Sequence, residues 1–158
     1  MDLIFKRATV LDMDGLAESR DEVLRAVYGL GDEADLSAVE KATREYYAGS
    51  LADGNHTAYL IRDGERFVGT GGISYYRVMP TWDNPTGWKA FIMNMYVRPE
   101  YRRKGIATRM LGVLLDDVKE RGITHIGLEA SEMGRPLYAR HGFTGAGDEL
   151  QLILPSRS

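Results

Sequence analysis

Apolar and polar residues along the first part of the chain predict one strand followed by two helices. The segment from Leu3 to Val10 has the pattern of an opening strand. Apolar residues then recur at helical spacing and predict a helix near residues 14–29. A second helix is expected near residues 38–52, because Ser37 and Glu40 have the spacing of a capping box ahead of an amphipathic stripe.

The middle of the chain predicts three strands. Two are expected at Ala58–Arg62 and Phe67–Tyr76, since the dipeptide Asp63-Gly64 between them is a strong signal for a hairpin turn. Turn-forming residues fill much of positions 79–87. A nearly continuous apolar run at Ala90–Val97 then predicts a buried strand.

The last third predicts two helices and two strands. One apolar face persists from Ile106 to Val118, and Gly122 stands where a glycine commonly ends a helix. A strand at Ile123–Ala130, a short helix at Glu132–Arg140 and a final strand at Glu149–Leu154 complete the order β-α-α-β-β-β-α-β-α-β. This order indicates an α+β or mixed α/β protein with a central mixed sheet.

Composition limits the class of protein. The 158 residues are expected to form a single domain, residues 1–158, with 27% charged residues, so a disordered chain is not indicated. The absence of cysteine excludes disulfides, cysteine-ligated zinc and a thiolate nucleophile. No metal site is expected.

Charge and hydropathy limit the partners. The net charge of −3 argues against a nucleic acid as the main partner. No apolar run has the length of a signal peptide core or of a membrane span, so we expect a cytoplasmic protein without a membrane partner.

The segment Met95–Leu111 carries the most chemical information, because a buried strand runs through a glycine-bearing turn directly into an amphipathic helix. The first N–H groups of a helix lack internal partners and favour anions such as phosphate. Four cations surround the turn against the single acid Glu100: Arg98, Arg102, Arg103 and Lys104. The alternative is a solvated basic turn that binds nothing.

The stretch Arg102-Arg103-Lys104-Gly105-Ile106-Ala107 fits the R/Q-x-x-G-x-G/A signature of the GCN5-related N-acetyltransferases, whose loop wraps the pyrophosphate of acetyl-CoA. The segment LEASEMGRPLYARHGF, Leu128–Phe143, is similar to the strand, short helix, L-Y and G-F pattern of the same family. The resemblance implies a central mixed, mostly antiparallel twisted sheet flanked by helices. It also implies acetyl-CoA as co-substrate.

The resemblance implies a set of cofactor-binding residues. These are Met95, Tyr96, Val97, Arg102, Arg103, Lys104, Gly105, Ile106, Ala107 and Thr108. In the family, backbone at the position of Met95 stabilises the oxyanion and backbone at Val97 meets the pantetheine arm. Ser131 stands where many members have Asn, and it could cap a helix and still meet the cofactor.

Tyr138 matches the tyrosine that family members commonly use as general acid, which here would protonate the leaving thiolate. The alternative is an aromatic side chain that packs beside Leu137. No general base is implied, because Phe91 occupies the position where some members have Glu. Glu129 and Asp83 are candidates for attracting the protonated amine or relaying its proton, and each could equally be a solvated surface acid.

Two other features remain open. Gly69-Thr70-Gly71-Gly72 lies inside a strand pattern and indicates close packing or a bulge rather than a dinucleotide loop. Trp82, in a turn-rich loop, is either a dimer contact or a wall of the acceptor site. We therefore expect an acyl-CoA-dependent N-acyltransferase acting by direct transfer to a small-molecule or peptide amine, with a homodimer as one possibility. The alternative is a catalytically silent acyl-CoA sensor.

Overall fold

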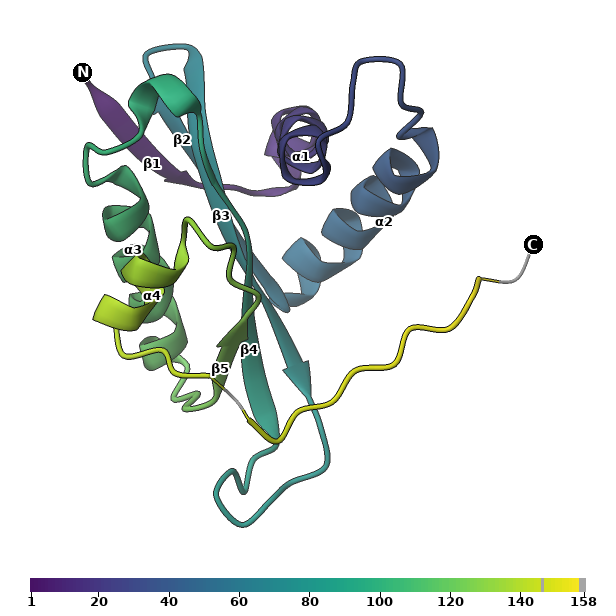
Figure 1. Ribbon diagram of the computed structural model, residues 1–158, viewed down its shortest axis with the longest axis vertical. Coiled ribbons are helices and arrows are strands. Elements are labelled where there is room, and N and C mark those ends of the chain that lie inside the picture. Colours follow the sequence, from purple (N-terminus) through teal and green to yellow (C-terminus); the bar gives the residue numbers. More distant parts are fainter. Residues whose placement is uncertain (146, 157–158) are drawn as a thin grey trace.

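A five-stranded sheet in the order β1-β2-β3-β4-β5 runs through the centre of the protein (Figure 1). The computed structural model describes residues 1–145 and 147–156. The strands are β1 Leu3–Arg7, β2 His56–Asp63, β3 Arg66–Arg77, β4 Trp88–Val97 and β5 Ile126–Leu128. The first four pair antiparallel and β5 pairs parallel to β4. The expected mixed, mostly antiparallel sheet of an α+β fold is confirmed.

Helices cover both faces of this sheet. They are α1 Met13–Tyr28, α2 Ser37–Asp53, α3 Ile106–Glu120 and α4 Arg135–Arg140, with short 3-10 turns at Val10–Asp12 and Pro99–Tyr101. Helices α1 and α2 lie on one face, and α3 and α4 lie on the other (Figure 1). None of the helices in the described part of the chain is both long enough and apolar enough to span a membrane.

The larger core lies between the sheet and α3. Four α3 residues at helical spacing have no exposed surface: Met110, Leu111, Leu114 and Val118. They pack against inward-facing strand residues such as Ile73 and Ile92. Burying a side chain of this size stabilises the fold by about 1.5–3 kcal/mol, so the α3 stripe fixes this helix on the sheet.

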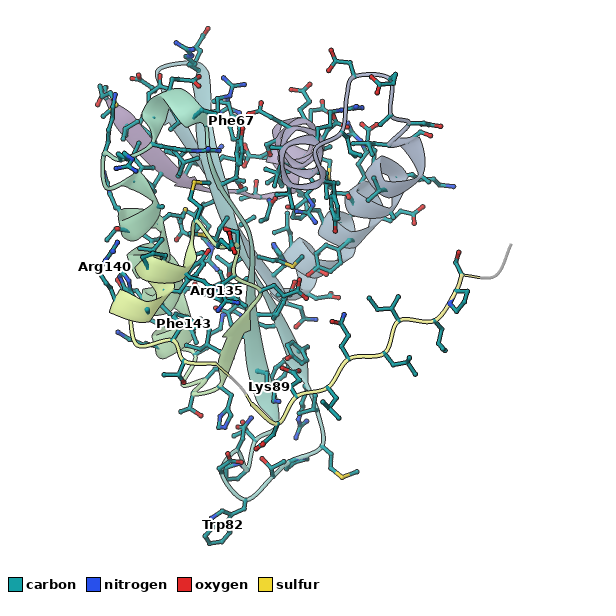
Figure 2. All side chains as sticks on the ribbon, viewed as in Figure 1. Phe67, Trp82, Lys89, Arg135, Arg140 and Phe143 are labelled. Carbon is teal, nitrogen blue, oxygen red and sulfur yellow. The ribbon has the colours of Figure 1, made fainter. Side chains whose placement is uncertain are left out.

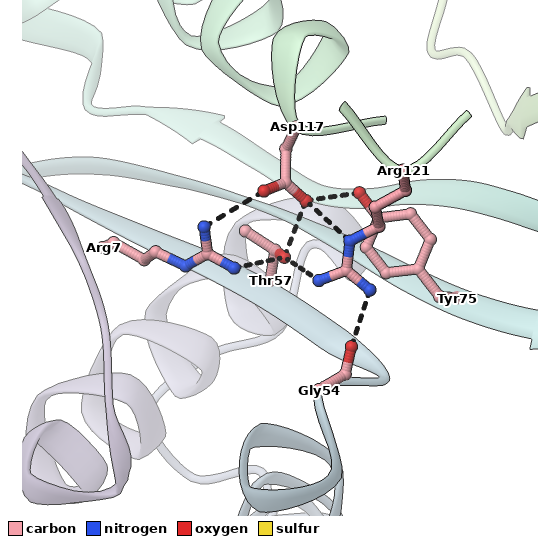
Figure 3. Close-up of polar contacts among 6 residues, drawn as sticks. All are labelled: Arg7, Gly54, Thr57, Tyr75, Asp117 and Arg121. Carbon is pink, nitrogen blue, oxygen red and sulfur yellow. Dashed lines mark hydrogen bonds and ion pairs between the residues drawn. The ribbon is translucent and has the colours of Figure 1, made fainter. Parts of the chain in front are cut away.

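A buried carboxylate anchors the C-terminal half of α3 (Figure 3). Asp117 accepts hydrogen bonds from Arg7 Nη1 at 3.1 Å, from Thr57 Oγ1 at 2.9 Å and from the Tyr75 hydroxyl, and it pairs with Arg121 at 3.4 Å. Burial acts to raise the pKa of Asp117, but the hydrogen bonds from Tyr75 and Thr57 and the two guanidinium charges outweigh it and hold the pKa below its usual value. The charge is therefore compensated.

Near the C-terminus one strand prediction is wrong and another is too long. Residues 149–154 form no strand, and β5 covers Ile126–Leu128 rather than residues 123–130. The pairing of β4 with β5 ends at Ile92, because β4 bends away beyond that point and offers no further partner. Alternation of apolar and polar residues indicates that a segment can form a strand, but the segment also needs a neighbouring strand with which to pair.

Two helix starts also differ from expectation. Ser37 is the first residue of α2 rather than its cap, and its N–H donates to Asp35 Oδ1 at 2.9 Å, so the predicted Ser37–Glu40 box does not form. Helix α4 begins at Arg135 rather than at residue 132. In both places a polar side chain just ahead of the helix bonds a free N–H group near its start.

Candidate functional site

Strand β4 contains a bulge that separates it from β5. Opposite β3, Met93 pairs with Gly72 and Tyr96 pairs with Thr70, so the register shifts between these pairs. Asn94 lies within the bulge with φ of 59°. Asn tolerates the left-handed region better than most residues. In the described residues β5 pairs with β4 only up to Ile92, which leaves that edge of β4 open beside Met95.

Glycines in β3 allow other groups to approach closely. A Cβ on Gly69 would lie 2.4 Å from the carbonyl oxygen of Tyr96, and one on Gly71 would lie 2.7 Å from Met110 Cγ. Neither position can accept a side chain without a shift of its neighbours. The interpretation of this glycine run as bulge and close packing is confirmed.

The loop before α3 directs backbone N–H groups outward. Arg103 and Gly105 both have left-handed conformations, with φ of 62° and 79°. In the described part of the chain, the N–H groups of residues 103–108 donate to no main-chain acceptor. Such a nest of N–H groups at a helix N-terminus, reinforced by the helix dipole, is suited to bind a phosphate.

The cations of this loop have different positions. Arg102 folds back so that its Nε donates to the carbonyl oxygen of Val97 at 2.9 Å, and its guanidinium lies 5.8 Å from the ring centre of Tyr96. Lys104 instead lies 5.7 Å from the ring centre of Tyr101. Arg102 thus braces the loop against the end of β4.

A cavity of about 920 Å³ lies between the end of β4, the start of α3 and α4. The predicted cofactor residues that line it are Met95, Tyr96, Val97, Arg102, Arg103, Gly105, Ile106, Ala107, Thr108 and Ser131. Lys104 is absent from this lining. Ala26 and Val27 of α1 also line the cavity, and sequence reasoning missed them because two apolar helix residues carry no signal of a distant site.

Tyr138 of α4 lines the same cavity. Its ring is 9% exposed and packs edge-on against Phe143, with ring centres 5.9 Å apart. Burial raises the pKa of the phenol, so Tyr138 is neutral and carries its proton at pH 7. The hydroxyl has no hydrogen-bond partner among the described side chains, which leaves its proton available.

Ser131 connects β5 to α4 and lines the cavity. Its Oγ accepts a hydrogen bond from the Gly134 N–H at 3.1 Å, and its carbonyl oxygen accepts from Gly134 and Arg135. The serine therefore holds the turn that leads into α4. The N-cap of α4 is Gly134, without a side-chain cap bond, so the expected capping by Ser131 is wrong and the serine lies one turn ahead of the helix.

The two candidate acids lie outside this lining. Glu129 is exposed just beyond β5, two residues before Ser131. Asp83 lies near the opposite end of β5, where its Oδ2 is 3.3 Å from His125 Nε2. Hydrogen bonds from Thr81 and His125 hold the pKa of Asp83 below its usual value. Of the two, only Glu129 is close to the cavity along the chain.

Trp82 lies at the tip of the loop between β3 and β4 and projects away from the protein (Figure 2). Its side chain is 99% exposed, and it is absent from the cavity lining. Within this chain, therefore, Trp82 forms no wall of the cavity.

A polar cluster on the other face of the sheet was not predicted. The Tyr46 hydroxyl lies 2.8 Å from His56 Nδ1 and 2.8 Å from Ser74 Oγ. His56 Nε2 is buried and has no hydrogen-bond partner in the described residues. Burial, aided by the charge of Arg20, lowers the pKa of His56 to about 4. Pairing of β2 with β3 brings His56 opposite Ser74, and packing of α2 on β2 adds Tyr46.

The chain matches known acetyltransferases in sequence and in fold. The profile of the acetyltransferase (GNAT) family matches residues 24–143. A predicted acetyltransferase from Clostridium acetobutylicum, solved with acetyl-CoA, has a TM-score of 0.86 and 32% identity over 96% of both chains. A GCN5-related N-acetyltransferase from Ralstonia eutropha has a TM-score of 0.80 and 25% identity, over 96% of this chain and 99% of that chain.

A more distant structure has the same fold. Glucosamine-6-phosphate N-acetyltransferase from Arabidopsis thaliana has a TM-score of 0.72 at 13% identity, over 98% of this chain and 100% of that chain. A search of curated proteins finds no match.

Proposed function

Because the chain belongs to the acetyltransferase (GNAT) family, we propose that it transfers the acetyl group of acetyl-CoA directly to a primary amine. The observation that carries this proposal is a single cavity that combines the free N–H groups before α3, the opening beside Met95 and the neutral phenol of Tyr138. An anion site, an exposed strand backbone and a proton donor are the three parts that such a transfer needs.

The loop before α3 would hold the pyrophosphate. The N–H groups of residues 103–108 supply the donors, and the Arg103 side chain adds a positive charge at the rim. The backbone at Val97 would receive the pantetheine arm in the manner of an added strand, because β4 has no β5 partner there. This placement directs the thioester toward Met95 and Tyr138.

The protein groups then stabilise the negative charges that develop on the carbonyl oxygen and on the leaving sulfur. A backbone N–H at Met95 would stabilise the negative carbonyl oxygen during attack, an effect worth a few kcal/mol for a well-placed donor. As the C–N bond forms and the C–S bond breaks, the Tyr138 hydroxyl gives its proton to the sulfur. The proton lost by the attacking amine restores the phenol, so the products are an amide and CoA thiol.

The acceptor is a small-molecule or peptide amine in this proposal. A primary amine is protonated in water, so acidic groups near the entrance would raise its local concentration. Glu129 is our candidate for this role, because it is exposed and precedes Ser131 of the cavity wall. It could also relay the amine proton to water.

A thiol-release assay tests the proposal. The chain contains no cysteine, so every thiol that appears in the assay comes from CoA. Purified protein with acetyl-CoA is challenged with a panel of polyamines, amino acids, aminoglycosides and peptide N-termini, and a sample without amine measures hydrolysis. Amine-dependent thiol release, with the acetylated product seen by mass spectrometry, supports the proposal. Tight binding of acetyl-CoA without turnover of any amine would favour a silent acyl-CoA sensor.

A further inference from the structure

The polar cluster of Tyr46, His56 and Ser74 has no part in the transfer steps described so far. The Tyr46 hydroxyl lies 2.8 Å from both Ser74 Oγ and His56 Nδ1, and His56 Nδ1 lies 3.3 Å from Ser74 Oγ. Tyr46 is 42% exposed, whereas His56 is buried and Ser74 is half-buried. The cluster therefore connects the half-buried hydroxyl of Ser74 to a hydroxyl that reaches solvent.

Ser74 places one end of this cluster beside the open edge of β4. It pairs with Phe91 across the β3–β4 ladder, and its Oγ donates a weak hydrogen bond to Met93 Sδ at 3.4 Å. Met93 directly follows Ile92, the last β4 residue that pairs with β5. It precedes Met95 by two residues, a distance of no more than about 7 Å along a strand. The Ser74 hydroxyl is thus close to the place where the thioester would be held.

The cluster lies on the face of the sheet that is opposite to α3. Ile73 and Ile92 point into the α3 core, so their neighbours Ser74 and Met93 point to the other side, where α2 lies (Figure 1). None of the three cluster residues lines the cofactor cavity. An acceptor can therefore approach the thioester from the α2 side, past the open edge of β4, while the cofactor fills the cavity.

The acceptor must lose a proton before it can attack. A primary amine is protonated at neutral pH, and the ammonium has no free electron pair. The surroundings of the cluster disfavour a positive charge, because burial and the charge of Arg20 on α1 lower the pKa of His56 to about 4. The ring of Tyr47 on α2 packs edge-on against His56 and adds no charge. An ammonium that reaches Ser74 is thus favoured to release its proton.

We propose that Ser74 and Tyr46 form the route by which the acceptor ammonium loses its proton, and that His56 positions both hydroxyls. The ammonium N–H bond breaks as an O–H bond forms at Ser74, the proton of Ser74 moves to Tyr46, and the proton of Tyr46 passes to solvent water. Each hydroxyl ends with one proton, and the nitrogen keeps its electron pair for attack. This inference rests on the proposed acetyl transfer and adds the step that precedes it.

Two acceptors of nearly equal shape provide the test. One is the amine identified by thiol release, and the other is its analogue with fluorine on the carbon next to the amino carbon, chosen so that its ammonium pKa lies below the assay pH. The analogue arrives neutral and needs no route for this proton. Ser74→Ala and Tyr46→Phe should each lower kcat for the ordinary amine at least about tenfold. For the fluorinated amine, kcat should stay within about threefold of the parent.

Tyr76→Phe is the matched control. It removes a tyrosine hydroxyl that is 41% exposed, on the same face of β3 and two residues from Ser74, and it should leave kcat for both amines unchanged. Equal losses of kcat with the two amines in Ser74→Ala and Tyr46→Phe would overturn the proton route and leave acetyl transfer intact. Failure of the parent protein to acetylate any amine would overturn acetyl transfer and, with it, the proton route.

Variants of His56 separate a positioning role from a structural one. His56→Asn keeps a polar group near the place of Nδ1 and should retain most of the parent kcat for the ordinary amine. His56→Leu removes that group and should lose activity with the ordinary amine only, as Ser74→Ala does. Equal losses with both amines would show that His56 is only structural and contradict its assignment. Circular dichroism checks folding, and if His56→Leu does not fold, the Ser74 and Tyr46 variants decide.

Discussion

Arg20, on α1, donates a hydrogen bond of 3.0 Å from Nη1 to Oδ1 of Asn94, the residue with left-handed backbone inside the β4 bulge. The bond crosses from the helix layer to the sheet. It therefore holds in place the bend that separates β4 from β5 and opens the cavity. The open edge of β4 is thus tied to α1 by a contact between residues 74 positions apart in the sequence.

Because Asn94 has a left-handed backbone in the bulge, the stability of a variant should depend on the backbone preference of the residue that replaces it. Asn94→Gly and Asn94→Val both lose the bond to Arg20, but glycine adopts a φ of 59° without strain. We expect the valine variant to be less stable than the glycine variant by about 1–3 kcal/mol. Urea unfolding of both proteins measures this difference. Equal stabilities would mean that the left-handed conformation at residue 94 is not required.

Gly105→Glu should abolish binding of CoA and acetyl-CoA. The substitution puts a side chain on a residue with φ of 79° and adds a negative charge beside the N–H groups that we assign to the pyrophosphate. Gly112→Glu is the matched control, because it adds the same charge farther along α3 where a Cβ meets nothing within 4 Å. Titration calorimetry should show binding in the control only. CoA binding by Gly105→Glu at the parent affinity would refute the loop assignment.

Tyr138→Phe should lower turnover by about 10²–10³, the usual contribution of proton donation, and leave acetyl-CoA affinity within a few-fold. The ring still packs against Phe143, so folding should be unaffected. Steady-state kinetics and calorimetry on the same preparation separate the two effects. A loss of cofactor affinity alone would make Tyr138 a packing residue.

Glu129→Gln should raise the KM of the amine acceptor, because it removes a negative charge from the approach to the cavity. Asp83→Asn removes the same charge at the other end of β5, next to His125, and should leave the KM unchanged. The comparison becomes possible once an acceptor is known. If neither variant differs from the parent in KM or in pH profile, Glu129 is a solvated surface acid.

His56 should make stability depend on pH. Its pKa is about 4 in the folded protein and 6.5 when unfolded, so the unfolded chain binds a proton more readily between these values. Stability is full above pH 6.5 and falls as the pH drops toward 4, by about 3 kcal/mol for this group. His56→Gln should lack this part of the loss. Urea unfolding of both proteins from pH 7 to 4 measures it, and parallel curves would argue against a buried neutral His56.

Local signals in the sequence were sufficient to predict α3, the helix that follows the proposed cofactor loop. The stripe from Ile106 to Val118 fixes the buried face of α3, and Gly105 alone marks the turn before it. These features depend on neighbours within a few residues, so periodicity and glycine reveal them. For the same reason Ser131 could be placed just ahead of one short helical segment and Tyr138 within it.

Features that depend on distant partners could not be predicted. The Asn94 bulge is visible only after β3 and β4 are in register, and the contribution of Val27 to the cavity needs the packing of α1. The expected strand at residues 149–154 has the right alternation, but nothing in its own sequence specifies a neighbour. The pattern of apolar and polar residues indicates which secondary structures a segment is able to form, and tertiary contacts decide which of them forms.

The contacts of Asp117 fix one end of α3, so a small rotation there displaces the other end. The carboxylate is pinned to β1, β2 and β3 near one end of the helix, and Gly105 lies at the other, about 18 Å away at 1.5 Å per residue. A tilt of about 3° at the pinned end would move the phosphate-binding end by about 1 Å, a displacement large enough to matter for transfer chemistry. The accuracy with which the loop is positioned therefore depends on residues on the far side of the core that touch no substrate.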